Sequence, residues 1–238
     1  MVNTILPVSL EGVGVTRRGK RLLGPIDLKL APDGVTVVLG PNGSGKTTLL
    51  RAMHGVERLS SGAVRWAVPE TVAQHHQAYV FQTPIMLRRS VAENLAFPLR
   101  LVGAPRRHVR EEVARWVARL GLEDRASLPA PRLSGGEQQK LALARALIRH
   151  PDVLFLDEPC ANLDGASIRA IENLLLEARD AGTRIVMTTH DIGQAKRLAS
   201  DAIFMLHGAV REAGEAAPFF EAPKTSELQS FFRGDIIE

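Results

Sequence analysis

A glycine-rich segment near residue 40 has the residue types and spacing of a phosphate-binding loop. Glycines let backbone N–H groups turn inward around an anion, and the N-terminus of a following helix adds the positive end of its dipole. Lys46 would reach the β- and γ-phosphates of a nucleotide, and the Thr47 hydroxyl would ligate Mg²⁺. We predict that a nucleotide binds where an apolar run (35–39) leads into an apolar helix, at Gly40, Pro41, Asn42, Gly43, Ser44, Gly45, Lys46, Thr47 and Thr48.

Two adjacent carboxylates end a second apolar run. Asp157 and Glu158 follow residues 153–156, and Pro159 stops the strand. Successive side chains of a strand point to opposite faces, so the two acids are expected to do different jobs. Asp157 would hold Mg²⁺ through water, whereas Glu158 would orient or deprotonate the water that attacks the γ-phosphate. Alone, the pair could be solvated side chains at a strand end, but beside a phosphate loop it indicates hydrolysis.

A third segment places a serine and two glycines at the start of a strong helix. Leu133, Ser134, Gly135, Gly136 and Glu137 run directly into the apolar pattern of residues 141–147. A serine at such a position is by itself an ordinary N-cap, but a helix start is also an anion site. In company with the phosphate loop, the segment resembles the signature sequence of the ATP-binding cassette (ABC) family of P-loop NTPases. The resemblance covers nearly the whole chain.

Three more positions match the motifs of that family. Gln82 resembles the glutamine of the Q-loop, and His190 resembles the switch histidine, although a lone histidine after a strand is usually only a polar strand end. Residues 161–164 resemble the D-loop, with Asn162 as a mild departure. The resemblance implies that Gln82 and His190 sense the γ-phosphate and that Gln82 joins Thr47 and Asp157 at Mg²⁺. With Lys46 and Glu158, Gln82 and His190 would form the catalytic set.

The resemblance also implies that ATP and Mg²⁺ are handled by two chains. Cassettes of this family pair head to tail, so that each ATP lies between the phosphate loop of one chain and the signature helix of the other. Ser134, Gly135, Gly136 and Glu137 would therefore contact the ATP bound to the partner, with Ser134 and Gly136 at its γ-phosphate. ATP binding would close this homodimer, and hydrolysis would let it open.

Apolar runs alternate with helical patterns, which predicts an α/β fold. The runs that are apolar throughout are typical of buried parallel strands and lie at 35–39, 78–81, 153–156 and 185–187. Near the N-terminus, alternating apolar and polar residues favour an antiparallel sheet; they lie at 8–10, 26–30 and 63–66. Helical spacing follows at Val109, Val113, Trp116, Val117 and Leu120, and again at Ile168, Ile171, Leu174 and Leu175.

These elements predict one ABC ATPase domain over residues 1–238. A RecA-like P-loop NTPase core with a parallel sheet and an N-terminal antiparallel β subdomain would comprise residues 1–89 and 133–238. Residues 90–132 show helical pattern and no convincing strand, so we predict a helical subdomain inserted there.

The composition favours a water-soluble globular fold. Lys and Arg number 30 against 26 Asp and Glu, a mild excess that does not call for a nucleic-acid partner. The single cysteine, Cys160, excludes an internal disulfide and favours a reducing compartment; with no base near it in sequence, we expect a structural thiol. No apolar run reaches the roughly 18–20 residues of a spanning helix, and the start does not resemble a secretory signal. Work at a membrane would be peripheral, at its cytoplasmic face.

Three functions compete at this stage. A P-loop kinase or simple nucleotide-binding module would not need the signature helix and the switch histidine. Chromosome-maintenance ABC proteins carry a long coiled coil in the insertion, and translation-associated ones carry two cassettes, whereas this chain has a short insertion and one cassette. A soluble assembly or repair ABC ATPase remains as the alternative to the energising subunit of a membrane transporter.

The segment after Gln82 supports the transporter interpretation. Ile85, Met86 and Leu87 stand beside Arg88 and Arg89, a mixture that suits a groove for a permease's short coupling helix. Alternatively, the three apolar residues pack the core of the insertion. A separate cassette chain resembles bacterial and archaeal importers, and residues 84–90 resemble the tungstate, molybdate and phosphate oxyanion group. Permease subunits and an external solute-binding protein would then be the partners that choose the cargo.

The adenine contact departs from the family pattern. Such cassettes usually carry an aromatic residue near the N-terminus that stacks on the base, but residues 16–20 contain none. The guanidinium of Arg17 or Arg18 could stack instead. The phenylalanines near the C-terminus, Phe219, Phe220, Phe231 and Phe232, are expected in core packing or a dimer contact.

Overall fold

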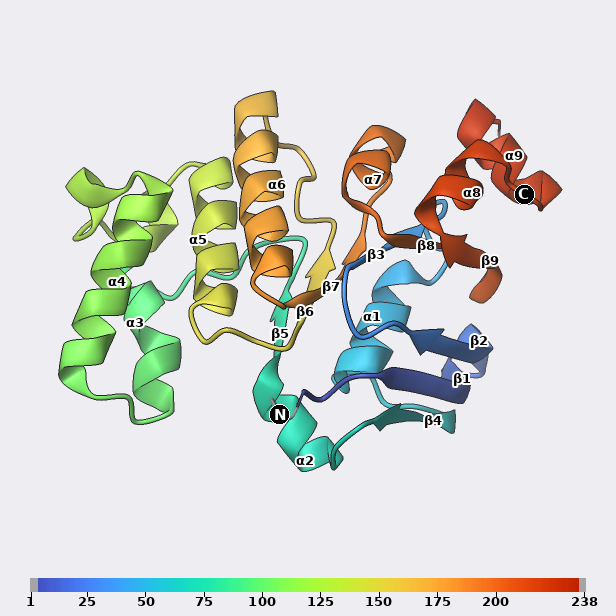
Figure 1. The fold of residues 1–238 in the computed structure, drawn as a ribbon, viewed down its shortest axis with the longest axis horizontal. Coiled ribbons are helices and arrows are strands. Elements are labelled where there is room, and N and C mark those ends of the chain that lie inside the picture. Colours follow the sequence, from blue (N-terminus) through green and yellow to red (C-terminus); the bar gives the residue numbers. More distant parts are fainter. Residues whose placement is uncertain (1–3, 236–238) are drawn as a thin grey trace.

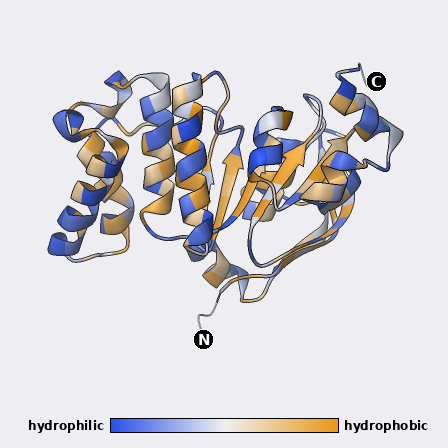
Figure 2. Ribbon diagram, turned by 45° about the horizontal axis from the view of Figure 1, so that its top comes forward, coloured by the Kyte–Doolittle hydropathy of each residue, from blue (hydrophilic) through white to orange (hydrophobic). Residues whose placement is uncertain are grey.

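The computed structural model describes residues 4–235 as two β-sheets with helices packed against them (Figure 1). The larger sheet has six strands and the smaller has three. Helices α3 and α4 form a block at one end of the molecule, separated from the sheets by α5 and α6 (Figure 1). The central strands are strongly hydrophobic, whereas the helices show alternating hydrophilic and hydrophobic sides (Figure 2). None of the helices in this part of the chain is long and apolar enough to cross a membrane.

The smaller sheet is antiparallel and covers α1. Its strands are β1 (Val8–Arg17), β2 (Lys20–Leu30) and β4 (Ser61–Trp66), in the order β2-β1-β4. Alternate residues of β1 and β2 are buried, and they pack with Leu49, Leu50 and Met53 of α1 in one apolar cluster. The alternating pattern in the sequence thus arises because one face of this sheet is buried and the other is exposed.

The larger sheet has the order β5-β6-β7-β3-β8-β9 and is parallel except for its edge strand β9. The parallel strands are β3 (Val35–Leu39), β5 (Gln77–Val80), β6 (Val153–Asp157), β7 (Arg184–Thr188) and β8 (Asp201–Leu206), and β9 is Ala209–Glu215. Every residue of β3, β6 and β7 is buried, as expected for strands covered on both faces. The carboxyl ends of these three central strands lie at one edge of the sheet, where the predicted site residues follow them.

Helices pack on both faces of the larger sheet. With α1 (Lys46–His54) on one face, α5 (Gly135–Leu147), α6 (Gly165–Asp180) and α7 (Ile192–Leu198) lie on the other (Figure 1). The remaining helices are α2 (Glu70–Ala73), α3 (Val91–Leu101), α4 (Arg106–Leu120), α8 (Ala216–Glu221) and α9 (Ser226–Arg233).

The helical insertion leaves and rejoins the core through two adjacent segments. Ser90 caps α3 with a capping box to Glu93, and the backbone of Ser90 pairs with Pro129 at the other end of the insertion. The amide of Ala130 also donates to the carbonyl of Arg89 at 2.9 Å. The predicted helical segment 90–132 therefore holds α3 and α4, and its described residues contain no strand apart from that isolated bridge.

The fold class predicted from the sequence is confirmed, with differences in detail. Phe81 was expected to end a strand, but β5 stops at Val80 and Phe81 is 38% exposed. Strands β8 and β9 and helices α7 to α9 were not predicted. Ala202–Leu206 of β8 is an apolar run like those of the predicted strands. In the edge strand β9, which begins after a two-residue turn, exposed and partly buried residues alternate only weakly, so its sequence gives little signal of a strand.

Candidate nucleotide-binding and hydrolysis site

The phosphate-binding loop joins β3 to α1 and is held by close backbone packing. Gly40 has φ 148°, and a Cβ there would come within 2.2 Å of the Met205 carbonyl oxygen. The amide of Gly208, in the turn between β8 and β9, donates to the carbonyl of Ser44 at 2.9 Å. A Cβ at Gly208 would in turn meet the Leu22 carbonyl at 2.6 Å. The loop is therefore fixed by β8 and β2, and its amides are aimed by the fold.

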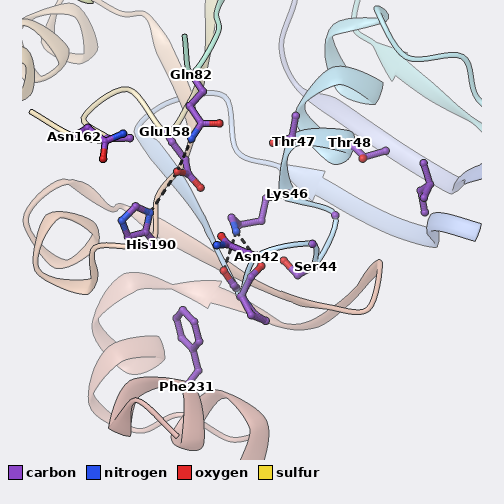
Figure 3. Close-up of a pocket in the computed structure, with 16 residues that line it drawn as sticks. Asn42, Ser44, Lys46, Thr47, Thr48, Gln82, Glu158, Asn162, His190 and Phe231 are labelled. Carbon is purple, nitrogen blue, oxygen red and sulfur yellow. Dashed lines mark hydrogen bonds and ion pairs between the residues drawn. The ribbon is translucent and has the colours of Figure 1, made fainter. Parts of the chain in front are cut away.

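Lys46 lies inside the loop, with 6% of the residue exposed. Its Nζ donates to the carbonyl oxygens of Gly40 at 2.8 Å and Pro41 at 3.1 Å (Figure 3). Burial lowers the pKa of Lys46, while the negative charges of Glu158 and Asp157 oppose that shift. The ammonium group is thus held at the floor of the site, where it is placed to pair with phosphate oxygens.

A cavity of about 910 Å³ opens over this loop. Its walls come from the loop, from β2, from the segments after β5, β6 and β7, and from α9. The lining residues are Leu22, Gly40, Pro41, Asn42, Gly43, Ser44, Gly45, Lys46, Thr47, Thr48, Gln82, Glu158, Ala161, Asn162, His190 and Phe231. All nine residues predicted for the phosphate loop, Lys46 among them, line this cavity. The other three predicted catalytic residues, Gln82, Glu158 and His190, line it as well.

Asp157 and Thr47 meet beneath the cavity. The Thr47 hydroxyl donates to Asp157 Oδ1 at 2.9 Å, and the Thr188 hydroxyl donates to the same oxygen at 3.0 Å. Asp157 is 3% exposed, and the Tyr79 hydroxyl lies 3.5 Å from its other oxygen. Burial raises the pKa of Tyr79, so the phenol stays a hydrogen-bond donor. Hydroxyl and carboxylate oxygens are the ligands that Mg²⁺ prefers, and Thr47 with Asp157 fits that requirement.

Glu158 turns the opposite way and gathers the two predicted sensors of the γ-phosphate. Gln82 Nε2 donates to Glu158 Oε2 at 3.2 Å, and His190 Nδ1 lies 3.4 Å from the same oxygen (Figure 3). Glu158 has φ 45°, which is uncommon outside glycine and typical of functional sites, and its amide donates to the Thr188 hydroxyl at 2.8 Å. In this arrangement Gln82 contacts Glu158 rather than the Thr47–Asp157 pair.

The signature residues lie elsewhere on the same chain and do not line the cavity. Ser134 caps α5: its hydroxyl accepts from the amide of Glu137, and the Glu137 carboxylate accepts from the Ser134 amide at 2.9 Å. Burial alone raises the pKa of Glu137, but hydrogen bonds from Ser134 and the charge of Arg125 outweigh it and leave the pKa lowered. A Cβ at Gly135 would meet open space. The structure therefore presents the turn as an exposed helix start.

The D-loop joins the cavity to α6. Asn162 lines the cavity with φ 60°, a left-handed conformation that asparagine tolerates better than most residues, which explains the departure at this position. Asp164 then caps α6 by accepting from the amides of Ala166 and Ser167, both at 2.9 Å. Cys160, two residues before Asn162, is partly buried, and burial raises the pKa of its thiol to about 11. That is the behaviour expected of a structural thiol.

Neither arginine predicted to contact adenine lines the cavity in this structure. Arg17 Nη2 donates to both carboxylate oxygens of Glu57, at 2.8 and 3.0 Å. Arg18 sits in the turn between β1 and β2 with φ 51° and does not line the cavity. Leu22 and Phe231 line it instead. Sequence analysis did not assign either of them to the site, because neither belongs to one of the spaced motifs.

The fold and the site define a nucleotide-hydrolysing P-loop protein. Residues 23–161 match the family model described as ABC transporter. The chain belongs to the ABC transporter family and is an ATP-hydrolysing cassette of that family.

Curated relatives and a solved structure agree with this assignment. The chain is 37% identical to the tungstate uptake system ATP-binding protein TupC of Peptoclostridium acidaminophilum, over 90% of this chain and 100% of that protein. It is 33% identical to a probable anion import ATP-binding protein of Haloferax volcanii, over 91% and 83% of the two chains. Other relatives of 33–37% identity are named for import of iron(III) and of zinc and for transport of glutamine.

Among solved structures, the chain is similar to cbiO1 of Clostridium perfringens, which is described as part of the ABC transporter complex cbiONQ. The two share 28% sequence identity with a TM-score of 0.81, over 97% of this chain and 95% of that one.

Proposed function

We propose that this chain powers the import of a solute across the cytoplasmic membrane, as one of two head-to-tail cassettes attached to a permease. Its curated relatives are import proteins, which supports the direction of transport. The observation that carries the proposal is an apolar groove lined by residues on both sides of Gln82, the predicted sensor of the γ-phosphate. A soluble assembly or repair ATPase would have no need of such a groove.

The groove lies between the segment after β5, helix α3 and helix α5, and it encloses about 380 Å³. Four exposed apolar side chains line it: Phe81 is 38% exposed, Ile85 61%, Phe97 38% and Leu101 71%. Arg145 and Arg149 add positive charge at its α5 side. An apolar floor with basic groups at one side fits a short amphipathic helix that carries an acidic residue.

The three apolar residues after Gln82 have different roles in the structure. Ile85 is exposed in the groove and Leu87 lines it, whereas Met86 packs against the main apolar core. The groove prediction therefore fits Ile85 and Leu87, and the core-packing alternative fits Met86.

The groove is tied to the signature helix by a buried amide. Asn94 is fully buried, and its side chain accepts from the amide of Leu87 at 3.0 Å and donates to the carbonyl of Ser90 at 2.9 Å. Arg145 of α5 donates to the same Asn94 oxygen at 3.1 Å and to the carbonyl of Ile85 at 2.6 Å. A partner helix pressed on Ile85 would thus act on α5, whose other end carries Ser134.

In the proposed reaction, each residue acts on the nucleotide from a position already described. Lys46 would pair with the β- and γ-phosphates, and Thr47 and Asp157 would hold Mg²⁺, which when bound neutralises charge on the phosphate oxygens. Glu158 would orient the attacking water and accept its proton, with its carboxylate held by Gln82 and His190. Ser134 and Gly136 of a second chain would complete the site from above the γ-phosphate.

For the cargo we propose an oxyanion such as tungstate or molybdate. The wording of residues 84–90 and the similarity to the tungstate uptake and anion import proteins support this class. No residue of the cassette is expected to touch the cargo, because the permease and the external solute-binding protein would select it.

The coupling proposal is tested in vesicles that hold the chain with the permease and the solute-binding protein encoded by neighbouring genes. Ile85→Glu or Leu87→Glu places an unpaired charge in the groove, so uptake should fall at least tenfold while the ATPase rate of the free cassette stays within about twofold. Val56→Glu is the matched control, since Val56 is 56% exposed and lies outside the groove. Unchanged uptake with both groove variants would disprove the coupling role of the groove. Absence of ATP-dependent uptake with the native chain would favour a soluble ATPase.

The cargo proposal needs a separate measurement in the same vesicles. ATPase stimulation by the solute-binding protein should be greatest with tungstate or molybdate and absent with glutamine, zinc or iron(III). Stimulation by one of the latter solutes alone would disprove the oxyanion assignment and leave the coupling proposal standing.

A further inference from the structure

Phe231 is a phenylalanine in the wall of a site built for phosphate. Of the described residues that line the cavity, it alone is a Phe, Tyr or Trp. It comes from α9, near the C-terminal end of the described chain, and its ring points from that helix toward Asn42 and the loop (Figure 3). The side chain is only half-buried, so part of an apolar ring stays exposed beside charged groups.

Packing of aromatic side chains and of helix α9 holds the Phe231 ring in position. Its centroid lies 5.3 Å from that of Phe204 on β8 and 6.2 Å from that of Phe232, which packs in turn on Phe219 and Phe220 at 6.1 and 5.7 Å. Leu228 is fully buried and anchors α9. Before the helix, Glu212 of β9 accepts from the amides of Lys224 and Thr225 at 3.0 and 2.9 Å. The half-exposed ring is therefore held in place by β8 and β9.

The nucleotide of the same chain offers this ring little to contact. Lys46, Glu158 and His190 mark the γ-phosphate end of the site, and Phe231 lies on the side of His190 and Asn42 (Figure 3). Thr48, which follows Thr47 at the start of α1, lies on the far side of the loop (Figure 3). The base is expected near residues 16–20, where the family usually carries its stacking aromatic residue. Phosphate gains nothing from an apolar ring, so neither base stacking nor phosphate binding explains it.

The remaining candidate contact for the Phe231 ring is the surface of a second chain, which is expected to cover the γ-phosphate. The signature residues of this chain lie outside its own cavity, so the site is incomplete without a second copy. We infer that Phe231 is buried against that second copy when the ATP-bound pair closes, and that it thereby adds an apolar contact at the edge of the ATP sandwich. The inference rests on the proposed head-to-tail pairing.

The first test measures closure separately from ATP binding. In the Glu158→Gln background, which is expected to stall the closed pair, the MgATP concentration for half-maximal dimer is measured by size-exclusion chromatography with light scattering. Phe231→Ala should raise it about tenfold, since burying half of a phenylalanine contributes about 1.4 kcal/mol, a factor of ten. The matched control Phe220→Ala, from a partly buried ring that neither lines the cavity nor packs on Phe231, should change it less than twofold. ATP binding to monomers carrying Ser134→Arg should stay within twofold for both variants.

A second measurement follows the contact directly. Phe231→Trp places a reporter at the ring, and its emission should shift to shorter wavelength with MgATP. The same variant combined with Ser134→Arg should show no shift, because the pair cannot close.

The possible outcomes are distinct. Equal dimer midpoints for Phe231→Ala and Phe220→Ala, or an emission shift that persists with Ser134→Arg, would overturn the inference and leave the pairing intact. An equal loss of ATP binding in the monomer would show that the ring contacts nucleotide in its own chain, which also overturns it. If Glu158→Gln with native Phe231 forms no ATP-dependent dimer, the head-to-tail pairing fails and takes the inference with it.

Discussion

The two parts of this chain that contact ATP in its family are built in opposite ways. At the phosphate loop, side chains from separate elements converge on a cavity: Lys46 from α1, Glu158 from the turn after β6 and His190 from the loop after β7. At the signature turn, Ser134 and Glu137 bond to each other, and the adjacent Gly135 faces open space. The first is a cavity lined by residues from several elements, and the second is an exposed helix start capped by its own residues.

We expect this difference to separate ATP binding, which one chain can perform, from ATP hydrolysis, which requires two chains. A cavity can hold a ligand within one chain, whereas an exposed helix start can act only on a ligand that another surface presents to it. Substitutions at the loop should therefore affect ATP binding in the monomer, and substitutions at the signature turn should affect only reactions of the pair.

The largest effect is expected from Lys46→Ala, which would remove the fixed positive charge of the loop. ATP affinity of the monomer should fall at least about a hundredfold, because charge-assisted contacts to two phosphates are lost from a buried position. Isothermal titration with MgATP measures this directly, with the exposed Lys29→Ala as control. Normal ATP hydrolysis by the Lys46 variant would refute the assignment of the loop.

Glu158→Gln should slow turnover about 10²–10⁴-fold, the range of a general base, while ATP affinity holds. The amide keeps the size of the side chain and can still accept from Gln82, so the local geometry is retained. With MgATP the variant should accumulate as a dimer on light scattering, and the exposed Glu177→Gln should hydrolyse ATP normally. A monomeric variant that turns over at the native rate would show that the acidic pair only ends a strand.

Ser134→Arg should slow hydrolysis about a hundredfold and leave monomer ATP affinity within twofold, because the serine would contact only the partner's nucleotide. Mixed with Lys46→Ala, it should regain activity from at most one of the two sites in each pair. Loss of ATP binding by the isolated variant would mean that the signature turn serves its own chain, and the contrast between the two regions would disappear.

The smallest effect is expected from Arg125→Ala. Arg125 pairs with Glu137 at 2.5 Å, but the arginine side chain is 52% exposed, and exposed ion pairs contribute only about 0–1 kcal/mol. Turnover should stay within about threefold, because the reciprocal bonds between Ser134 and Glu137 keep the turn in shape. A much larger loss of ATPase rate would show that the turn depends on this outer pair.

The sequence allowed the chemistry of the site to be predicted more fully than its walls. Lys46, Asp157 and His190 each stand in a spaced motif beside an apolar run, and the carboxyl ends of parallel strands necessarily meet. Phe231 and Leu22 could not be found this way, since their place depends on how α9 and β2 pack on the loop. The bond of Arg17 to Glu57 spans 40 residues and follows from tertiary packing alone.

The close backbone packing around the phosphate loop has a consequence for how the protein tolerates variation. Gly40 and Gly208 are confined by the carbonyls of Met205 and Leu22, at distances where any side chain would collide. In a library of all single substitutions selected for uptake, Gly208 should thus be depleted as strongly as Lys46, although it is expected to touch no phosphate. The depletion of substitutions along β2 and the β8–β9 turn would then identify the residues that hold the phosphate loop in shape, in addition to those that contact phosphate.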